Sequence, residues 1–399
     1  MSEPVMGVGI CRPPALRKFA LLATALSLLG CAVLSAPALA AAAPATDVVY
    51  SVESAKASKS LMLDVVHAGK RLVAVGDRGH ILYSDDQGAT WTQAKVPTRA
   101  LLTSVFFVDD QHGWAVGHDA QILASEDGGV TWTKQYEDLK RESPLLDVWF
   151  QDANSGFAVG AYGALLATTD GGKNWEDVSD RLDNEDQYHL NGIAAVKDAG
   201  LFIVGEQGSM FRSSDWGQTW EKLEGPYEGS LFGVIGTAEA NTLLAYGLRG
   251  NLFRSADWGQ TWEKLEGPYE GSLFGVIGTA EANTLLAYGL RGNLFRSTDF
   301  GSTWEPVELK ATRGALEFGL SGATLLDDGS IVIVGNGGSV IRSNDNGETF
   351  SVFNRPDRIS VSAVTAAGNG NLILAGQGGV RVTSPTGAGA ENGKNGSSK

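Results

Sequence analysis

The residues whose type and spacing could do chemistry are, first, seven aspartates that recur along the chain. Each is the third residue of an eight-residue pattern, first written SDDQGATW from Ser84 and last SNDNGETF from Ser343. The seven are Asp86, Asp127, Asp170, Asp215, Asp257, Asp299 and Asp345, and consecutive members are 41 to 46 residues apart. A carboxylate can ligate calcium or transfer a proton, but seven equivalent carboxylates cannot form one active site. A short Asp side chain also caps the amides of a tight turn, and Gly supplies the positive φ such a turn needs. We therefore expect a structural role for all seven.

Two further carboxylates, Asp64 and Asp147, precede a Val in the innermost strand of the first and third repeats. A pair of carboxylates is what glycoside hydrolysis requires, and their separation decides whether a pair can act. These two come from repeats that are not adjacent. We expect them to line a central channel, with catalysis as the alternative.

Other chemical groups are sparse in the sequence. The histidines show no metal-ligand spacing and are His67, His80, His112, His118 and His189. Glycine-rich segments such as Gly335–Gly338 look like strand turns, without the following helix that a phosphate loop needs. The sequence therefore predicts no catalytic residue, metal or cofactor, and a protein that is not an enzyme.

One turn, between the second and third strands of each repeat, varies in sequence at a geometrically fixed place. Such variation on one rim is typical of a recognition surface. Arg78, Arg249 and Arg291 lie in this turn, and Arg is favoured at interface hot spots. We predict that these three arginines bind a partner, with ordinary solvated arginines as the alternative. The charged connections Lys134–Ser143 and Ser179–Tyr188 are second candidates for contact.

The elements that must position these residues are short strands repeated at a fixed period. A repeat of about 40 to 45 residues corresponds to one four-stranded propeller blade. Gly is abundant, at 52 of 399 residues, and no helical periodicity persists after residue 40. The fold class is therefore all-β, a β-propeller spanning residues 46–382. Units begin near Leu61, Leu101, Leu145, Leu190, Leu231, Leu273, Phe318 and Ile359. The last unit lacks an outer strand, which residues 47–51 could supply to close the ring.

Two of the units are copies of each other. Residues 215–255 and 257–297 are identical at all 41 positions. With both copies counted the chain has eight units. We predict eight blades, and the alternative is a seven-bladed ring with a strained or extruded copy.

The first 40 residues have the features of an export signal. Arg12, Arg17 and Lys18 precede the apolar run Phe19–Leu34, and Ala38–Ala40 forms a small-residue cleavage site. A lipobox-like sequence ending at Cys31 is a rival site, which would place a lipid anchor on that cysteine, and an uncut membrane anchor is a third possibility. We expect an exported, periplasmic or lumen-like protein. Residues 383–399, rich in Gly, Ser and Asn, read as a disordered tail.

The charge limits the class of partner. The chain has a formal charge of −15, and removal of residues 1–40 would leave 28 Lys and Arg against 45 Asp and Glu, or −17. Nucleic-acid binding needs a concentrated basic surface, so it is not expected. The mature chain would contain no cysteine under the first cleavage site, which excludes disulfides. We expect a monomer.

The repeats resemble the Asp-box, or BNR, repeat over residues 60–382. The combination resembles most the photosystem II stability and assembly factor family. It consists of an opening Leu-x-x-Val strand at 102–105, the strand Gly113–Gly117, a Gly-x-Ile/Leu turn at 79–82 and the box. This resemblance implies a seven-bladed propeller that assists assembly of a membrane protein complex from the lumenal or periplasmic side, without catalysis. Relatives occur in bacteria without photosynthesis, where the client must differ.

The Asp-box also occurs in sialidases and xyloglucanases. The alternative function is therefore a glycoside hydrolase or sugar-binding propeller of the sialidase-like type. The chain contains no Arg-Ile-Pro motif at the start of the repeats, which weakens that alternative.

Overall fold

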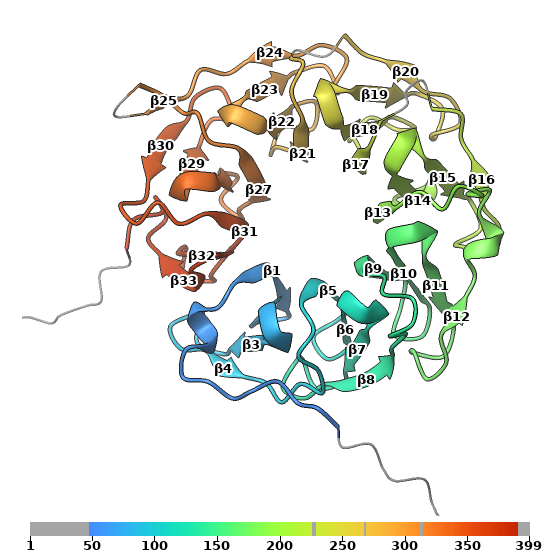
Figure 1. Ribbon diagram of the computed structural model, residues 1–399. Coiled ribbons are helices and arrows are strands. Elements are labelled where there is room, and N and C mark those ends of the chain that lie inside the picture. Colours follow the sequence, from blue (N-terminus) through green and yellow to red (C-terminus); the bar gives the residue numbers. More distant parts are fainter. Residues whose placement is uncertain (1–47, 226–228, 267–268, 312–313, 390–399) are drawn as a thin grey trace, which may run out of the picture. The chain divides into compact units, whose positions relative to one another are not determined.

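The computed structural model describes residues 48–225, 229–266, 269–311 and 314–389. In this part of the chain, eight antiparallel sheets, here called blades 1 to 8, follow one another around a ring (Figure 1). Each blade is a meander whose first strand is innermost. This confirms the all-β propeller and the count of eight, one more than the seven blades that the family resemblance implied.

Blades 1 to 4 have four strands each. Their strands are β1 Met62–Ala68, β2 Arg71–Gly76, β3 Ile81–Ser84 and β4 Thr92–Gln93; β5 Leu102–Phe107, β6 Gly113–Gly117, β7 Ile122–Ser125 and β8 Thr133–Tyr136; β9 Leu145–Phe150, β10 Gly156–Gly160, β11 Leu165–Thr168 and β12 Glu176–Asp177; β13 Leu190–Val196, β14 Gly200–Gly205, β15 Met210–Ser213 and β16 Glu221–Lys222.

Blades 5 to 7 also have four strands, and blade 8 has three. They are β17 Leu231–Gly236, β18 Leu243–Gly247, β19 Leu252–Ser255 and β20 Glu263–Lys264; β21 Leu273–Gly278, β22 Leu285–Gly289, β23 Leu294–Ser297 and β24 Glu305–Pro306; β27 Leu320–Leu325, β28 Ile331–Gly335, β29 Ser339–Ser343 and β30 Ser351–Asn354; β31 Val361–Ala366, β32 Leu372–Gly376 and β33 Gly379–Thr383. A separate hairpin, β25 Lys310–Ala311 and β26 Gly314–Ala315, lies between blades 6 and 7.

The helical content consists of three-residue 3-10 turns. They are η1 Ala57–Lys59, η2 Asp77–Gly79, η3 His118–Ala120, η4 Ala161–Gly163, η5 Ser179–Arg181, η6 Glu206–Gly208, η7 Leu248–Gly250, η8 Leu290–Gly292 and η9 Asn336–Gly338. No helix of the described residues is long and apolar enough to cross a membrane. Since the two identical copies each build an ordinary blade, neither is extruded.

The hydrophobic cores lie between the blades. Eight clusters of buried side chains each join two neighbouring blades, from the pair 1 and 2 round to the pair 8 and 1. The second strand of a blade is covered on both faces, so the successive residues Leu243 and Leu244 of β18 are buried in two different clusters. Burial of apolar area on both faces stabilises the stack, since each Å² contributes about 25 cal/mol.

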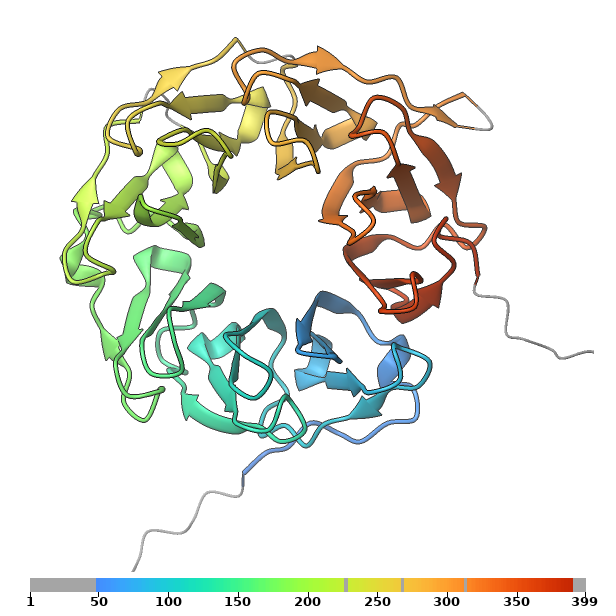
Figure 2. The same ribbon diagram turned by 180° about the vertical axis from the view of Figure 1, so that it is seen from behind.

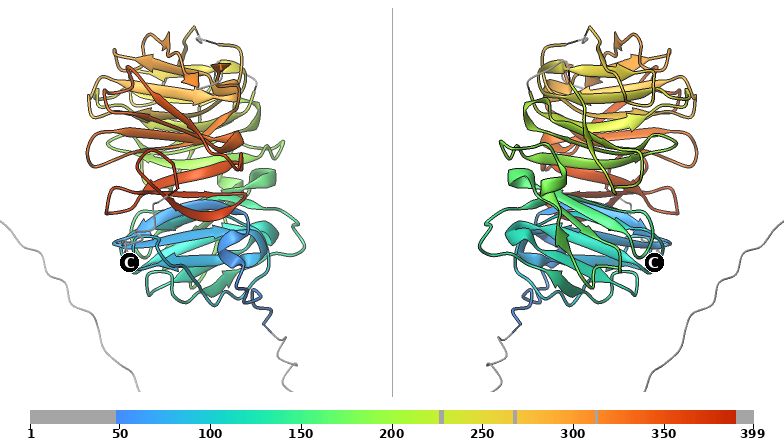
Figure 3. Two further views of the ribbon diagram at one scale, coloured as in Figure 1. Left: turned by 90° about the vertical axis from the view of Figure 1, so that its left-hand side faces the viewer. Right: turned by 90° about the vertical axis from the view of Figure 1, so that its right-hand side faces the viewer.

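The ring closes by packing of blade 8 on blade 1. Met62 and Leu72 share a cluster with Ile373 and Ala375, and η1 packs on β33. In Figures 1, 2 and 3 the blue first blade lies beside the red last blade. Closure therefore requires no exchange of strands.

The segment near residue 50 does not complete blade 8, contrary to the prediction. The Ser51 amide donates to the Val96 carbonyl (2.8 Å), and Arg99 Nε donates to the Tyr50 carbonyl (2.9 Å). The Lys95 ammonium lies 4.6 Å from the centre of the Tyr50 ring. Lys95, Val96 and Arg99 come directly after β4, the outermost strand of blade 1. Their contacts therefore hold the segment against the outer edge of that blade.

The two predicted terminal segments fall largely outside the described residues. Positions 1–40, the export signal, and 390–399, most of the predicted tail, lie there. Within 383–389 the chain turns back on itself, because Thr383 pairs with Gly389 and the Arg355 guanidinium donates to the Gly387 carbonyl (3.1 Å).

Candidate functional site

The Asp-box of blade 1 is a closed hydrogen-bond network around a tight turn. Asp86 Oδ1 accepts hydrogen bonds from Ser84 Oγ and the Thr90 amide (2.8 Å each), and Oδ2 accepts from Thr90 Oγ1 (2.5 Å). The buried Ser84 hydroxyl accepts from the Gly88 amide (2.8 Å). The same network surrounds the other six box aspartates, Asp127, Asp170, Asp215, Asp257, Asp299 and Asp345.

The box turn requires glycine for two reasons. Gly217 has a φ of +89°, and a Cβ there would lie 2.0 Å from Cζ of Phe157 in the preceding blade. The residue before it, Trp216, is also left-handed (φ 59°), so two consecutive residues adopt positive φ as in a type I′ hairpin turn. The turn therefore packs directly against the preceding blade.

The box carboxylates are engaged within their own turns. The Thr219 hydroxyl and amide lower the pKa of Asp215 to about 2, so this carboxylate is ionised at neutral pH. Among the described residues, no group of three or more His, Cys, Asp and Glu side chains is placed to hold a metal ion.

Asp64 and Asp147, the two inner carboxylates, link blades through hydrogen bonds. Asp64 Oδ2 accepts from the amide of Val105 in blade 2 (3.2 Å). Asp147 accepts from Ser104 Oγ in blade 2 (3.2 Å) and from the amide of Ile193 in blade 4 (3.1 Å). Burial raises the pKa of both, that of Asp147 to about 6.

The variable turns lie together on one face of the ring. They are the 3-10 turns η2 to η4 and η6 to η9, which face the viewer in Figure 1. The middle residue of each is left-handed, with φ of 57° at Arg78, 56° at Arg249 and 59° at Arg291. We call this face the turn rim.

The structure brings two of the three rim arginines into neighbouring blades. Arg249 lies in blade 5 and Arg291 in blade 6, whereas Arg78 lies in blade 1. Arg78 is close to a carboxylate of its own turn, Asp77 (3.4 Å). Of the ion pairs among the described residues, none involves Arg249 or Arg291.

Sequence reasoning missed the exposed apolar residues beside these arginines. They are Phe274 (38% exposed), Leu290 (39%) and Phe318 (41%), and the Phe274 ring centre lies 6.0 Å from that of Phe232. For Phe274 the available signal was Phe as the second residue of the innermost strand. At that position four other blades have a polar residue, Thr103, Asn191, Ser321 or Ser362, and two have Leu63 or Leu146.

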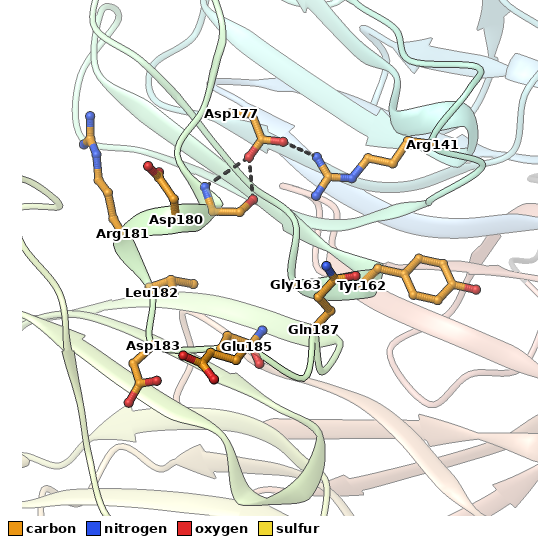
Figure 4. A pocket seen from close by; sticks show the side chains of 12 residues that line it. Arg141, Tyr162, Gly163, Asp177, Asp180, Arg181, Leu182, Asp183, Glu185 and Gln187 are labelled. Atoms are coloured by element: carbon orange, nitrogen blue, oxygen red, sulfur yellow. Dashed lines mark hydrogen bonds and ion pairs between the residues drawn. The ribbon is translucent and has the colours of Figure 1, made fainter.

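The charged connection Ser179–Tyr188 borders an open cavity of about 1090 Å³ (Figure 4). One edge of it is fixed by Asp177, which pairs with the Arg141 guanidinium and accepts from Ser179 Oγ (2.5 Å). Three acidic side chains, Asp180, Asp183 and Glu185, also line it. Arg141 and Arg181 line it as well, so its walls carry charges of both signs with acidic groups in excess.

Four-stranded blades closed by Asp-box turns define the class, an Asp-box β-propeller. The family model described as "Photosynthesis system II assembly factor YCF48" matches residues 83–143 and 135–322, and the chain belongs to this family. No curated protein matches the chain.

Three solved structures illustrate the likeness. "YCF48 bound to D1 peptide" is 23% identical, with a TM-score of 0.55 over 70% of this chain and 90% of the other. "YCF48 from Cyanidioschyzon merolae" is 20% identical, with a TM-score of 0.53 over 73% and 97%. The computationally designed Ika8 protein is 12% identical, with a TM-score of 0.64 over 81% and 96%. At these identities the structural comparisons establish the propeller fold.

Proposed function

We propose that this chain is an exported, non-catalytic scaffold that binds a subunit of a membrane protein complex through its turn rim. The observation that carries the proposal is the rim itself. Seven turns of one fixed geometry present six different sequences on one face, and the two identical turns present arginines that pair with no acidic side chain among the described residues. Membership of the YCF48 family and a YCF48 structure with a D1 peptide support a membrane-protein segment as the partner.

The hydrogen bonding of the carboxylates supports the non-catalytic part of the proposal. Box aspartates are capped within their turns, and both inner aspartates accept main-chain hydrogen bonds from neighbouring blades. A glycosidase remains the second candidate because Asp147 has a pKa of about 6, which suits a general acid.

Affinity isolation from detergent-solubilised membranes tests the scaffold proposal. The mature chain should retain a membrane protein, and Arg78→Glu combined with Arg249→Glu should lose it. If no membrane protein co-purifies with the wild type, the scaffold proposal fails.

An assay on a panel of aryl glycosides tests the second candidate. We expect no turnover by the wild-type chain. Turnover that disappears in Asp147→Asn would replace the scaffold with a hydrolase.

Export and lipidation require a separate test. Fractionation of cells that express the full chain should place it outside the cytoplasm. A wild-type chain that stays with the membranes, together with a Cys31→Ser variant that is released from them, would establish the lipid anchor. If the wild type and the variant are both released from the membranes, cleavage after Ala40 is favoured.

A further inference from the structure

A cavity of about 720 Å³ lies between blades 3 and 4, and an exposed indole forms part of its wall. This indole belongs to Trp216 in the box turn of blade 4, and 42% of the residue is exposed. Successive turns of a meander alternate between the two faces of the ring. The box turns therefore lie on the face opposite the turn rim, which is the face toward the viewer in Figure 2. The Trp216 side of the cavity is thus separate from the surface proposed to bind the membrane client.

The Trp216 ring is held in one orientation without being buried. The ring of Trp149, in β9 of blade 3, is nearly parallel to it, with 13° between the ring planes and 6.0 Å between the ring centres. These values are typical of an offset aromatic pair. The Trp216 backbone is left-handed (φ 59°), which is strained for a bulky residue. In the second copy, packing of Trp258 on the core offsets this strain. Trp216 remains exposed, so we look for the use of its ring at the surface.

Polar side chains that are free to bind surround this ring. Gln151, Glu176 and Gln218 line the cavity, are exposed, and form no side-chain hydrogen bond with any residue that the structure describes. Arg181 also lines it, and its guanidinium lies 3.5 Å from the Gly217 carbonyl oxygen. Two amides, one carboxylate and one guanidinium offer both hydrogen-bond donors and acceptors. Their planar ends can each form two hydrogen bonds with neighbouring groups of a ligand.

We propose that this cavity is a carbohydrate-binding site for a β-linked glucose oligosaccharide, and we call it the indole cleft. The hydroxyls of such a sugar ring are equatorial, so its two faces carry C–H groups and its edge carries the hydroxyls. One face packs on the Trp216 indole, while the hydroxyls exchange hydrogen bonds with the Gln151 and Gln218 amides. An aromatic wall with a few polar groups, in a volume of about 300–1,000 Å³, is typical of a small-molecule site. The proposal goes beyond the scaffold function and does not rest on it.

Other classes of ligand fit this lining less well. A phosphate would meet three carboxylates and one guanidinium among the described residues that line the cleft, since Asp170 and Asp215 lie beside Glu176. An acyl chain would leave the amides and Glu176 without hydrogen-bond partners, which costs free energy. A cation such as choline would be attracted by the indole and the carboxylates. However, the Asp170 and Asp215 carboxylates already accept hydrogen bonds within their own turns. Choline is therefore the competing ligand in the test.

Isothermal titration calorimetry of the mature chain with cellotetraose tests the proposal. We expect saturable binding that does not change with salt, because the ligand is uncharged. Trp216→Ala should weaken binding about tenfold, since it removes the surface on which the sugar stacks, whereas Trp216→Phe should keep most of the affinity. Gln218→Ala should weaken binding about fivefold through loss of a hydrogen bond. Both positions are exposed, so these variants keep the fold.

The second copy supplies matched controls, because Trp258 and Gln260 occupy the same positions in an identical sequence. Trp258 packs on the core between blades 4 and 5, so it does not present its ring as Trp216 does. Trp258→Ala and Gln260→Ala should therefore leave the affinity for cellotetraose unchanged. Gln260 is exposed, so its variant remains a valid control even if loss of the Trp258 ring unfolds the chain.

Three outcomes would overturn the proposal. They are the absence of binding to cellotetraose, equal losses of affinity in Gln218→Ala and Gln260→Ala, and binding of choline chloride in place of the sugar that Trp216→Ala abolishes. Affinity isolation separates this inference from the proposed function, because Trp216→Ala should still retain the membrane client. A wild-type chain that retains the client but does not bind cellotetraose overturns the indole cleft alone and leaves the scaffold in place.

Discussion

Residues 215–255 and 257–297 have one sequence but two sets of neighbours. In the first copy Trp216 is 42% exposed and its ring is nearly parallel to that of Trp149 in blade 3. In the second copy Trp258 packs on the core between blades 4 and 5, and its amide donates to the Asn241 carbonyl (3.1 Å). Their backbones agree, with φ of 59° and 63°. Identical residues thus fix the turn, while the preceding blade fixes how much of each side chain is buried.

The comparison also explains why an added blade is accommodated. Each box turn contacts the blade before it, so a copied unit needs only a predecessor with an apolar second strand. Gly217 packs on Phe157 and Gly259 on Phe202, which are both in second strands. A repeat whose contacts reach only its neighbours can be duplicated without loss of its core.

The largest effect should follow substitution of the box glycines. Gly217→Ala places a Cβ 2.0 Å from Phe157 at a φ of +89°, and Gly259→Ala places one 2.6 Å from Phe202 at +79°. Strain and overpacking together should lower the free energy of unfolding by about 4 kcal/mol at Gly217, and by less at Gly259. Urea denaturation measures both.

Gly370→Ala is the control for that pair. Its φ is +83°, but nothing lies within 4 Å of the added Cβ. It should cost only the left-handed strain, about 1 kcal/mol. Equal losses at all three glycines would contradict a role for the preceding blade.

The next largest effect should come from replacing the two tryptophans that have positive φ, because the loss of stability should differ between the two copies. Trp258→Gly removes packing on the core and should cost about 2 kcal/mol. Trp216→Gly removes an exposed ring and relieves strain at positive φ, so it should be nearly neutral. Blades 2 and 3 already have Gly at this position, Gly128 and Gly171. Urea denaturation decides, and equal costs would show that the neighbouring blades do not matter.

The fold was predictable because its signal is local and repeated. A repeat period near 42 residues and one turn motif indicate where each blade begins and ends. Seven copies of that motif therefore determine the order and the number of the blades. The prediction that the segment near residue 50 completes the last blade was wrong. Where Tyr50 packs depends on its contacts with Arg99 and Lys95, and the positions of these two residues are known only from the folded structure of blade 1.

The apolar part of the candidate site could not be found from alternation of residues. A bulge follows the first residue of the innermost strand, where the register shifts between Leu231 and Gly233 and between Leu273 and Gly275. The shift breaks the period of two, so Phe274 looks like a core residue in the sequence but is exposed in the fold. In contrast, the adjacency of Arg249 and Arg291 follows directly from the order of the blades.

Acid titration should distinguish the box carboxylates of the two copies. The Thr219 hydroxyl chiefly lowers the pKa of Asp215, to about 2. At Asp257 burial raises the pKa, and the Thr261 hydroxyl and amide outweigh it, so the net shift is downward. Both pKa values lie below the ordinary 3.8, so the stabilisation is present above pH 3.8 and is lost as the pH falls through the folded values.

Carboxyl NMR of the mature chain measures this difference. We expect Asp215 to titrate at lower pH than Asp257. In Asp215→Asn the loss of stability below pH 3.8 should be shallower than in the wild type. Coincident titrations would mean that the neighbouring blades do not affect the boxes.

The smallest effect concerns one ion pair that the copies form differently. Arg254 Nη2 lies 2.8 Å from Glu239 Oε2, whereas Arg296 Nη2 lies 4.0 Å from Glu281 Oε2. The reason is blade 7, whose Asn346 carbonyl accepts a hydrogen bond from Arg296 Nε (2.9 Å), while Arg254 Nε has no hydrogen-bond partner in the described part of the chain.

Since the glutamates are exposed, Glu239→Gln should lower the free energy of unfolding by about 0.5 kcal/mol, and Glu281→Gln should have no measurable effect. Thermal unfolding at low and high salt measures both, and the difference should disappear at high salt. A difference that persists at high salt would mean that Glu239 stabilises the fold through the hydrogen bond it accepts from the Thr242 hydroxyl (2.9 Å). The corresponding bond of the second copy, from the Thr284 hydroxyl to Glu281, is longer (3.2 Å).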